Sequence, residues 1–232
     1  MHVAELWRYP IKSLGGERLE QAEVRVDGIV GDRSLMVFDA RERFVTARTR
    51  PRLLGLSATV GPLGEPLVDG RPWDSPATAA AVSDAAGHGA RLTSAAGQER
   101  RFDDTPLLVA TDGTIDSLGI DGRRLRPNIV IAGVEGLAER GWPGDALWIG
   151  EVELAVRRLC KRCVVTTFDP DTLEQDAGVL RTIDADYEER VALNCEVTRP
   201  GRLQVGDEVE LARSTPAMDR PRPETKARSR PR

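Results

Sequence analysis

Short apolar segments recur along most of the chain, separated by Gly, Pro and Asp. Short apolar runs between turn-forming residues are typical of β-strands. The strands that this pattern predicts are Val3–Arg8, Leu19–Val26, Ser34–Asp39, Leu54–Val60, Ala90–Thr93, Asn128–Ala132, Leu147–Ile149, Val152–Val156, Val164–Phe168, Asn194–Thr198 and Glu208–Ala212. Strands and turns repeated in this way predict a mainly β fold, either a barrel or a sandwich.

Few segments have helical character. Asp112–Leu118 follows Thr111, which is a suitable N-cap residue, so we expect a helix there. The alanine-rich segment Asp74–Ala86 is compatible with either a helix or a strand. The sequence therefore predicts a mainly β protein with a few helices.

A weak domain boundary lies near Ala95–Glu99, where small and polar residues separate two strand-rich halves. We expect a smaller β-rich domain over residues 1–95 and a second domain over residues 96–213. From Ser214 onward the chain consists largely of Pro, Arg and Ser with almost no apolar residues. Because such a composition cannot form a core, residues 214–232 are predicted to be a disordered tail.

Composition narrows the functional class. The 232 residues carry 33 Lys and Arg against 37 Asp and Glu, a formal net charge of −4, and the two signs are mixed along the chain. This balance argues against a nucleic-acid-binding protein. No apolar run is long enough for a transmembrane helix, and the N-terminus does not resemble a secretory signal. Three cysteines do not make a disulfide framework, so we expect a cytoplasmic protein without a membrane partner.

The segment Arg157–Asp171, RRLCKRCVVTTFDPD, contains the pair Cys160 and Cys163. A zinc site needs about four ligands, and the chain offers only one further cysteine and two histidines. A redox dithiol would place its first cysteine at a helix N-terminus, whereas VVTTF favours a strand. A third interpretation is one thiolate, stabilised by the adjacent basic residues, that binds a soft metal. Two buried structural cysteines are an equally open interpretation.

Three further segments offer groups that bind anions. In Arg8–Leu14, RYPIKSL, the ammonium of Lys12 stands beside the hydroxyl of Ser13, a pair suited to phosphate. Arg33 and Arg48 each lie near the edge of an expected strand, where a guanidinium can bind an anion through two hydrogen bonds. For each of these residues a solvated turn or a local ion pair is the alternative.

The segment LRPNIVI places Arg126 and Asn128 on either side of Pro127, before an apolar strand. Because side chains alternate in an extended chain, we expect these two side chains to point the same way. Arginine would bind phosphate, and asparagine can both donate to and accept from a heterocycle. A simple turn before the strand is the alternative.

Taken together and in this order, the motifs resemble those of the MOSC family, in the branch that includes the mitochondrial amidoxime-reducing component and its bacterial relatives. The resemblance is carried by YPIKS at Tyr9–Ser13, GDR at Gly31–Arg33, TAR at Thr46–Arg48, RPNIVI at Arg126–Ile131, RC–VVTT–DPDT within Arg162–Thr172, and G–L–VGD–V–L within Gly201–Leu211. It implies a MOSC β-barrel domain preceded by a smaller β-rich N-terminal domain.

The resemblance also implies a site. It makes Cys163 the ligand of molybdenum in a molybdenum–pterin cofactor and leaves Cys160 a structural or supporting role. The residues that it implies as contacts to the pterin and its phosphate are Lys12, Ser13, Arg33, Arg48, Arg126, Asn128 and Arg162. Asp169 is a candidate proton relay at the mouth of the site, although it is equally suited to capping the turn before Pro170.

The function that the resemblance implies is reduction of N-hydroxylated small molecules such as hydroxylamines and amidoximes. The chain lacks the cysteines of an iron–sulfur domain, so electrons are expected from a separate ferredoxin- or flavoprotein-type reductase. A different class of function is compatible with the same residues: a non-catalytic carrier or sulfur-transfer protein for the cofactor. Two departures bear on substrate specificity: the chain has Leu173–Glu174–Gln175 where the family often has Gly, and the stretch that follows, up to Val191, is acidic. Lys161, between the cysteines, adds positive charge near the expected metal.

Overall fold

The computed structural model describes residues 1–98 and 101–213, and this part of the chain is mainly β with three α-helices. The expected fold class is thereby confirmed. The strands are β1 His2–Arg8, β2 Glu17–Leu19, β3 Gln21–Arg25, β4 Gly28–Ile29, β5 Leu35–Phe38, β6 Phe44–Val45, β7 Ala58–Val60, β8 Pro66–Val68, β9 Arg71–Pro72, β10 Arg91–Ser94, β11 Leu107–Thr111, β12 Ile129–Ala132, β13 Ala146–Ile149, β14 Val152–Lys161, β15 Arg190–Arg199, β16 Gly201–Gln204 and β17 Val209–Ala212. The helices are α1 Pro76–Ala86, α2 Asp112–Leu118 and α3 Ala177–Asp186, and the 3-10 helices are η1 Pro51–Gly55, η2 Gly122–Leu125, η3 Ala138–Gly141 and η4 Val164–Thr167.

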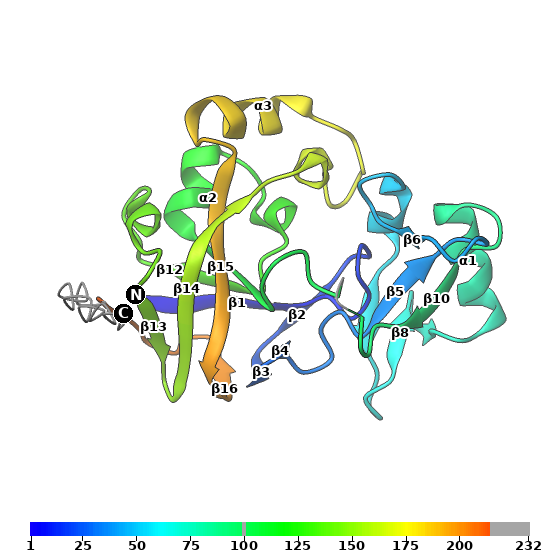
Figure 1. The fold of residues 1–232 in the computed structure, drawn as a ribbon, viewed down its shortest axis with the longest axis horizontal. Helices are drawn as coiled ribbons and strands as arrows, with labels where there is room; N and C mark the ends of the chain where they lie inside the picture. The colour runs from blue at the N-terminus through cyan, green and yellow to red at the C-terminus, as the bar shows by residue number, and fades with distance from the viewer. Residues whose placement is uncertain (99–100, 214–232) are drawn as a thin grey trace, which may run out of the picture.

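An eight-stranded sheet forms the centre of one half of the molecule, in the order β17-β13-β14-β15-β11-β12-β1-β2. Figure 1 shows the long strands β14 and β15 crossing this half, with α3 above them and α2 beside their upper part. The three-stranded sheet β10-β5-β6 lies in the other half together with α1 (Figure 1). Each half has its own cluster of buried apolar side chains.

The first strands of the chain pair with strands from the second part of the sequence. β1 pairs antiparallel with β12, and β3 pairs antiparallel with β16 near the C-terminal end of the described chain. The chain then leaves β1 through Pro10 and enters the other half, where Lys12 N donates to Leu35 O at 2.9 Å. Because the N-terminal strands are shared in this way, the boundary at residue 95 stays a prediction. The predicted disordered tail lies outside the described residues.

Most predicted strands are present, but Val164–Phe168 is not one of them: Val164–Thr167 forms η4. The hydroxyl of Thr166 donates to Cys163 O and that of Thr167 to Val164 O, both at 2.7 Å. These local bonds satisfy the backbone carbonyls without a neighbouring strand and outweigh the β propensity of valine and threonine. Leu54–Val60 is likewise a strand only from Ala58, since its first residues belong to η1.

The predicted helix Asp112–Leu118 is confirmed as α2, and the Thr111 side chain accepts from Thr114 N as an N-cap. The ambiguous segment Asp74–Ala86 is resolved as helix α1, which begins with Pro76 after the cap Ser75. Helix α3 was not predicted, although Val179, Ile183 and Tyr187 recur at helical spacing and are all buried. No helix among the described residues is long and apolar enough to cross a membrane.

The attachment of β1 to the core can be tested with Leu6. Leu6 is 0% exposed and lies opposite Ile129 of β12 and Leu19 of β2. Leu6→Ala should lower the free energy of unfolding by about 2–5 kcal/mol, because it leaves a cavity in the core. Leu63, which is 92% exposed, supplies the control: Leu63→Ala should change the free energy of unfolding by less than about 0.5 kcal/mol. Urea unfolding measures both, and equal effects would show that β1 is not part of the cooperative core.

Candidate functional site

A cavity of about 570 Å³ lies where the N-terminal segments meet β14 and η4. The side chains of its lining include seven cationic groups and two carboxylates; these are Lys12, Arg33, Arg48, Arg126, Arg158, Lys161 and Arg162, with Asp103 and Asp104. The whole chain has a net charge of −4, so positive charge is concentrated in this cavity. A concave surface lined by one sign of charge attracts ligands of the opposite sign, here anions.

Lys12 and Ser13 form one wall of the cavity, directly after the chain leaves β1. Ser13 has a positive φ of 78°, so the chain turns sharply at this point. Both residues are buried at the cavity wall, and Lys12 Nζ lies 2.8 Å from Asp103 Oδ1. Burial lowers the pKa of Lys12, and the neighbouring Asp103 opposes this effect. The predicted pair is therefore present at the cavity, as a buried ammonium beside a hydroxyl.

Arg33 and Arg126 both lie against the ring of Tyr9. Their guanidinium carbons lie 5.3 Å and 4.3 Å from the ring centroid. Arg33 forms an ion pair with Asp32, which is fully buried and also accepts from Tyr9 N at 2.7 Å. In the described part of the chain no carboxylate forms an ion pair with Arg126, and burial lowers the pKa of Arg126. Arg126 is half-buried, and a cation in such a position without an ion-pair partner can bind an external anion.

Asn128 lines the cavity, but its amide already bonds to the protein. Its Oδ1 accepts from Leu108 N at 3.2 Å and from Arg33 at 3.4 Å, and its Nδ2 donates to Trp7 O at 3.3 Å. Arg126 has left-handed backbone angles, φ 55° and ψ 49°. The prediction of an extended chain through these residues is therefore wrong, although Arg126 and Asn128 do reach the same cavity.

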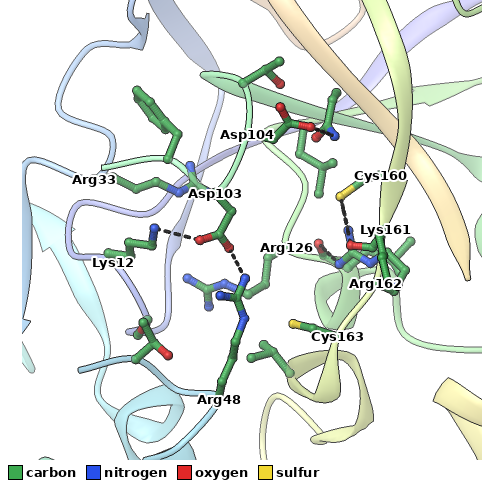
Figure 2. Close-up of a pocket in the computed structure, with 18 of the residues that line it drawn as sticks. Lys12, Arg33, Arg48, Asp103, Asp104, Arg126, Cys160, Lys161, Arg162 and Cys163 are labelled. Carbon is green, nitrogen blue, oxygen red and sulfur yellow. Dashed lines mark hydrogen bonds and ion pairs between the residues drawn. The ribbon is translucent and has the colours of Figure 1, made fainter. Parts of the chain in front are cut away.

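Two of the three cysteines face the cavity. Figure 2 shows Cys160 and Cys163 on the side of β14 and η4, with Lys12 and Arg33 on the opposite side. Cys163 comes immediately before η4 and is partly exposed, whereas Cys195 is buried in the core and burial raises the pKa of its thiol. Burial by itself lowers the pKa of Arg48, but interaction with the Cys163 sulfur and with Asp103 raises it overall.

Arg162 holds the segment between the cysteines in place. Its NH1 donates to Cys160 Sγ at 3.3 Å and its NH2 to Leu125 O at 2.7 Å, while its Nε is buried without a hydrogen-bond partner. Within residues 1–98 and 101–213, no group of three or more His, Cys, Asp or Glu side chains is placed so that it could hold a metal ion. A metal bound at Cys163 would therefore take its remaining ligands from a bound molecule.

The structure places Asp169 outside the lining of this cavity. Its Oδ1 accepts from the backbone N–H groups of Thr172 and Asp171, each at 3.0 Å, and its Oδ2 lies 3.0 Å from Arg124. The hydrogen bonds from Thr172 and Asp171 lower the pKa of Asp169. This is the turn-capping position that the sequence left open as the alternative to a proton relay.

Asp103 and Asp104 are cavity residues that the sequence reasoning missed. Asp103 bridges Lys12 and Arg48, while Asp104 accepts from Arg158 and from Asn194 Nδ2. The available signal was FDDTP, two adjacent carboxylates directly before the apolar strand that became β11. Acidic residues at such a strand edge are positioned to pair with the basic motifs already identified.

Fold and cavity together define a two-part β protein with a pocket that is rich in cationic side chains and contains two cysteines. The family model of the MOSC N-terminal beta barrel domain matches residues 1–103, and that of the MOSC domain matches residues 104–210. The chain belongs to the MOSC family.

Several characterised proteins are similar in sequence. Mitochondrial amidoxime-reducing component 1 of Homo sapiens is 29% identical, over 73% of this chain and 67% of that protein. Mitochondrial amidoxime reducing component 2 of Macaca fascicularis is also 29% identical, with the same shares covered. The chain thus spans about two thirds of the length of these relatives.

Solved structures show a more distant likeness. The YUAD protein of Bacillus subtilis superposes with a TM-score of 0.48 at 12% identity, over 92% of this chain and 96% of that one. YiiM of Escherichia coli has a TM-score of 0.37 at 15% identity, over 48% of this chain and 56% of that one.

The three thiols should differ in reactivity. Cys160 and Cys163 are partly exposed beside cationic groups, whereas Cys195 is buried. A disulfide reagent should therefore modify two thiols of the folded chain rapidly and the third only on unfolding. Cys160→Ser and Cys163→Ser should each remove one rapid phase. Three rapid phases in the native protein would contradict this placement of Cys195.

The titration of Tyr9 gives a pH-dependent prediction. Burial raises the pKa of Tyr9 to about 12, against about 10 in an unfolded chain. Between these values the folded protein retains a proton that the unfolded chain loses, so the free energy of unfolding should fall as the pH rises from about 10 to about 12. Tyr9→Phe should flatten this decline. Denaturant unfolding across the range measures it, and an unchanged slope in Tyr9→Phe would contradict the assignment.

Proposed function

We propose that this chain binds a molybdenum–pterin cofactor, with the Cys163 thiolate as a ligand of the metal, and reduces N-hydroxylated small molecules. The observation that carries the proposal is a partly exposed thiol in a cavity that concentrates positive charge. The names of the similar proteins support the reductase reading, since they are called amidoxime-reducing components.

The residues present fit such a group. An anionic cofactor needs cations that the protein has not already neutralised, and Arg126 has no carboxylate partner among the described residues. A heterocycle with polar edges needs unused donors, and Arg162 Nε is buried without a partner. We assign Arg126 and Arg162 to holding the cofactor on these grounds, and Lys12, Ser13, Arg33 and Arg48 because they line the same cavity.

Asn128 has a different part in this proposal. Because its amide bonds to Trp7 and Leu108, it positions Arg126 and the end of β1 relative to the cavity. Replacement of a residue with this role would change cofactor affinity by moving the neighbouring cations.

The chemistry divides between the cofactor and the chain. When bound, the molybdenum centre would supply the two-electron removal of oxygen from the substrate. The chain supplies the environment: Arg48 interacts with the Cys163 sulfur and Arg162 donates to Cys160 Sγ, so each of the two sulfurs lies beside a cation. The remaining cations bind and orient the cofactor, and the opening of the cavity admits a small molecule.

Electrons are proposed to come from a separate donor protein of the ferredoxin- or flavoprotein-reductase type. An iron–sulfur cluster takes about four cysteine ligands, and this chain has three cysteines, one of them in the core.

A second candidate function is supported by Cys160. This thiol also faces the cavity and lies 3.3 Å from Arg162, so the site has a second cysteine beside a cation. A carrier that transfers sulfur to the cofactor would use such a thiol and would need the same cations. Turnover distinguishes this function from the reductase.

Cofactor-loaded protein should oxidise a reduced viologen when it is given a hydroxylamine. Cys163→Ser should lower the rate by more than about 100-fold, because it removes a metal ligand rather than one of that ligand's partners. Cys160→Ser is the matched control and should retain the rate within about ten-fold. Loaded native protein without turnover would favour the carrier, and equal losses in both variants would overturn the choice of Cys163.

A further inference from the structure

The carboxylate of Asp103 occupies the part of the cavity where two of the proposed cofactor-binding cations converge. Its Oδ1 lies 2.8 Å from Lys12 Nζ and its Oδ2 lies 2.7 Å from Arg48 NH2 (Figure 2). The Lys12 side chain is only 8% exposed, whereas that of Asp103 is 59% exposed. The carboxylate is thus on the open side of a buried cation, where an incoming anion would bind.

The residues around Asp103 hold its segment in place independently of this contact. Arg101 donates to Asp32 O at 2.7 Å and pairs with Asp27 at 2.8 Å. On the other side, Asp104 is held by Arg158 and by Asn194. Release of the Asp103 side chain therefore leaves the backbone anchored on both sides, so the exchange of one anion for another needs only a side-chain rotation.

The electrostatics favour such an exchange for a phosphate. Partial burial raises the pKa of Asp103, but Lys12 and Arg48 outweigh this and lower it, so the group is a carboxylate at neutral pH. The Asp103 carboxylate supplies one negative charge to Lys12 and Arg48, and Arg33 is a third cation nearby. A phosphate monoester carries up to two charges and three acceptor oxygens, so it satisfies these cations better than a carboxylate does.

We infer that Asp103 is a built-in counter-anion, which a phosphate group must displace from Lys12 and Arg48, and which excludes monoanions from the cavity. This inference rests on the proposed function in one respect: the natural ligand is expected to carry a phosphate group. Asp103 thereby sets the anion specificity of the site, since only a ligand that binds more strongly than the tethered carboxylate can enter.

The test measures binding of inorganic phosphate to the full chain by calorimetry at low ionic strength. Asp103→Asn removes the charge but keeps the shape, and should tighten phosphate binding roughly ten-fold because the competitor is gone. Acetate, a monoanion with the same functional group as Asp103, should bind to Asp103→Asn and not to the native protein. Asp103→Glu retains the charge, so it should bind phosphate as the native protein does and should not bind acetate.

Two controls isolate the mechanism. Glu210→Gln, an exposed position on β17, makes the same change in net charge and should leave phosphate binding unchanged. Adding Lys12→Met to Asp103→Asn should abolish the gain, because the cation released by Asp103 is then missing. Phosphate binding that is unchanged or weaker in Asp103→Asn would overturn the inference, as would undetectable phosphate binding in every variant. Absence of molybdenum would overturn the proposed function alone, since these measurements use no cofactor.

Discussion

The buried amide of Asn128 joins three strands that come from different parts of the sequence. Its backbone N–H donates to Leu108 O of β11 at 2.7 Å, and its carbonyl accepts from Trp7 N of β1 at 2.8 Å. The Asn128 side chain bonds to the same two residues: its Oδ1 accepts from Leu108 N, and its Nδ2 donates to Trp7 O. Because a buried amide left without partners is costly, this arrangement fixes β1 against β11 and β12. Lys12 follows β1 and Arg126 precedes β12, so both cations depend on this junction for their position in the cavity.

The second constraint on the cavity is electrostatic. A chain with a net negative charge brings seven cationic side chains together and provides two carboxylates in return. Arg33 forms an ion pair with the adjacent Asp32, whereas the guanidinium of Arg126 packs against the ring of Tyr9. Concentrated positive charge at a binding site opposes the stability of the free protein, and an anionic ligand relieves it. Ligand binding and folding are therefore expected to be coupled in this molecule.

The sequence was sufficient for the type of fold and for most of the cationic residues of the cavity, because the basic motifs and the cysteine pair are local patterns with a chemical meaning. It was insufficient where distant contacts decide. Asp103 gains significance only because folding places it between Lys12 and Arg48. Asn128 has the amide expected of a ligand contact, but this amide bonds to the protein backbone. One partner, Trp7, lies more than a hundred positions away in the sequence, and the other, Leu108, lies about twenty positions away. The segment after Cys163 is not the predicted strand, because the hydroxyls of Thr166 and Thr167 bond to nearby backbone carbonyls. The β propensity of these residues does not take such local hydrogen bonds into account.

The account depends on Cys163 as the residue through which the chain holds molybdenum. Elemental analysis of protein purified from a host that makes the cofactor tests this most directly. The account predicts about one molybdenum per chain in the native protein and in Cys160→Ser, and almost none in Cys163→Ser, because only the latter loses the proposed ligand. Native protein without molybdenum, or a metal content that is the same in Cys163→Ser as in the native protein, would contradict it.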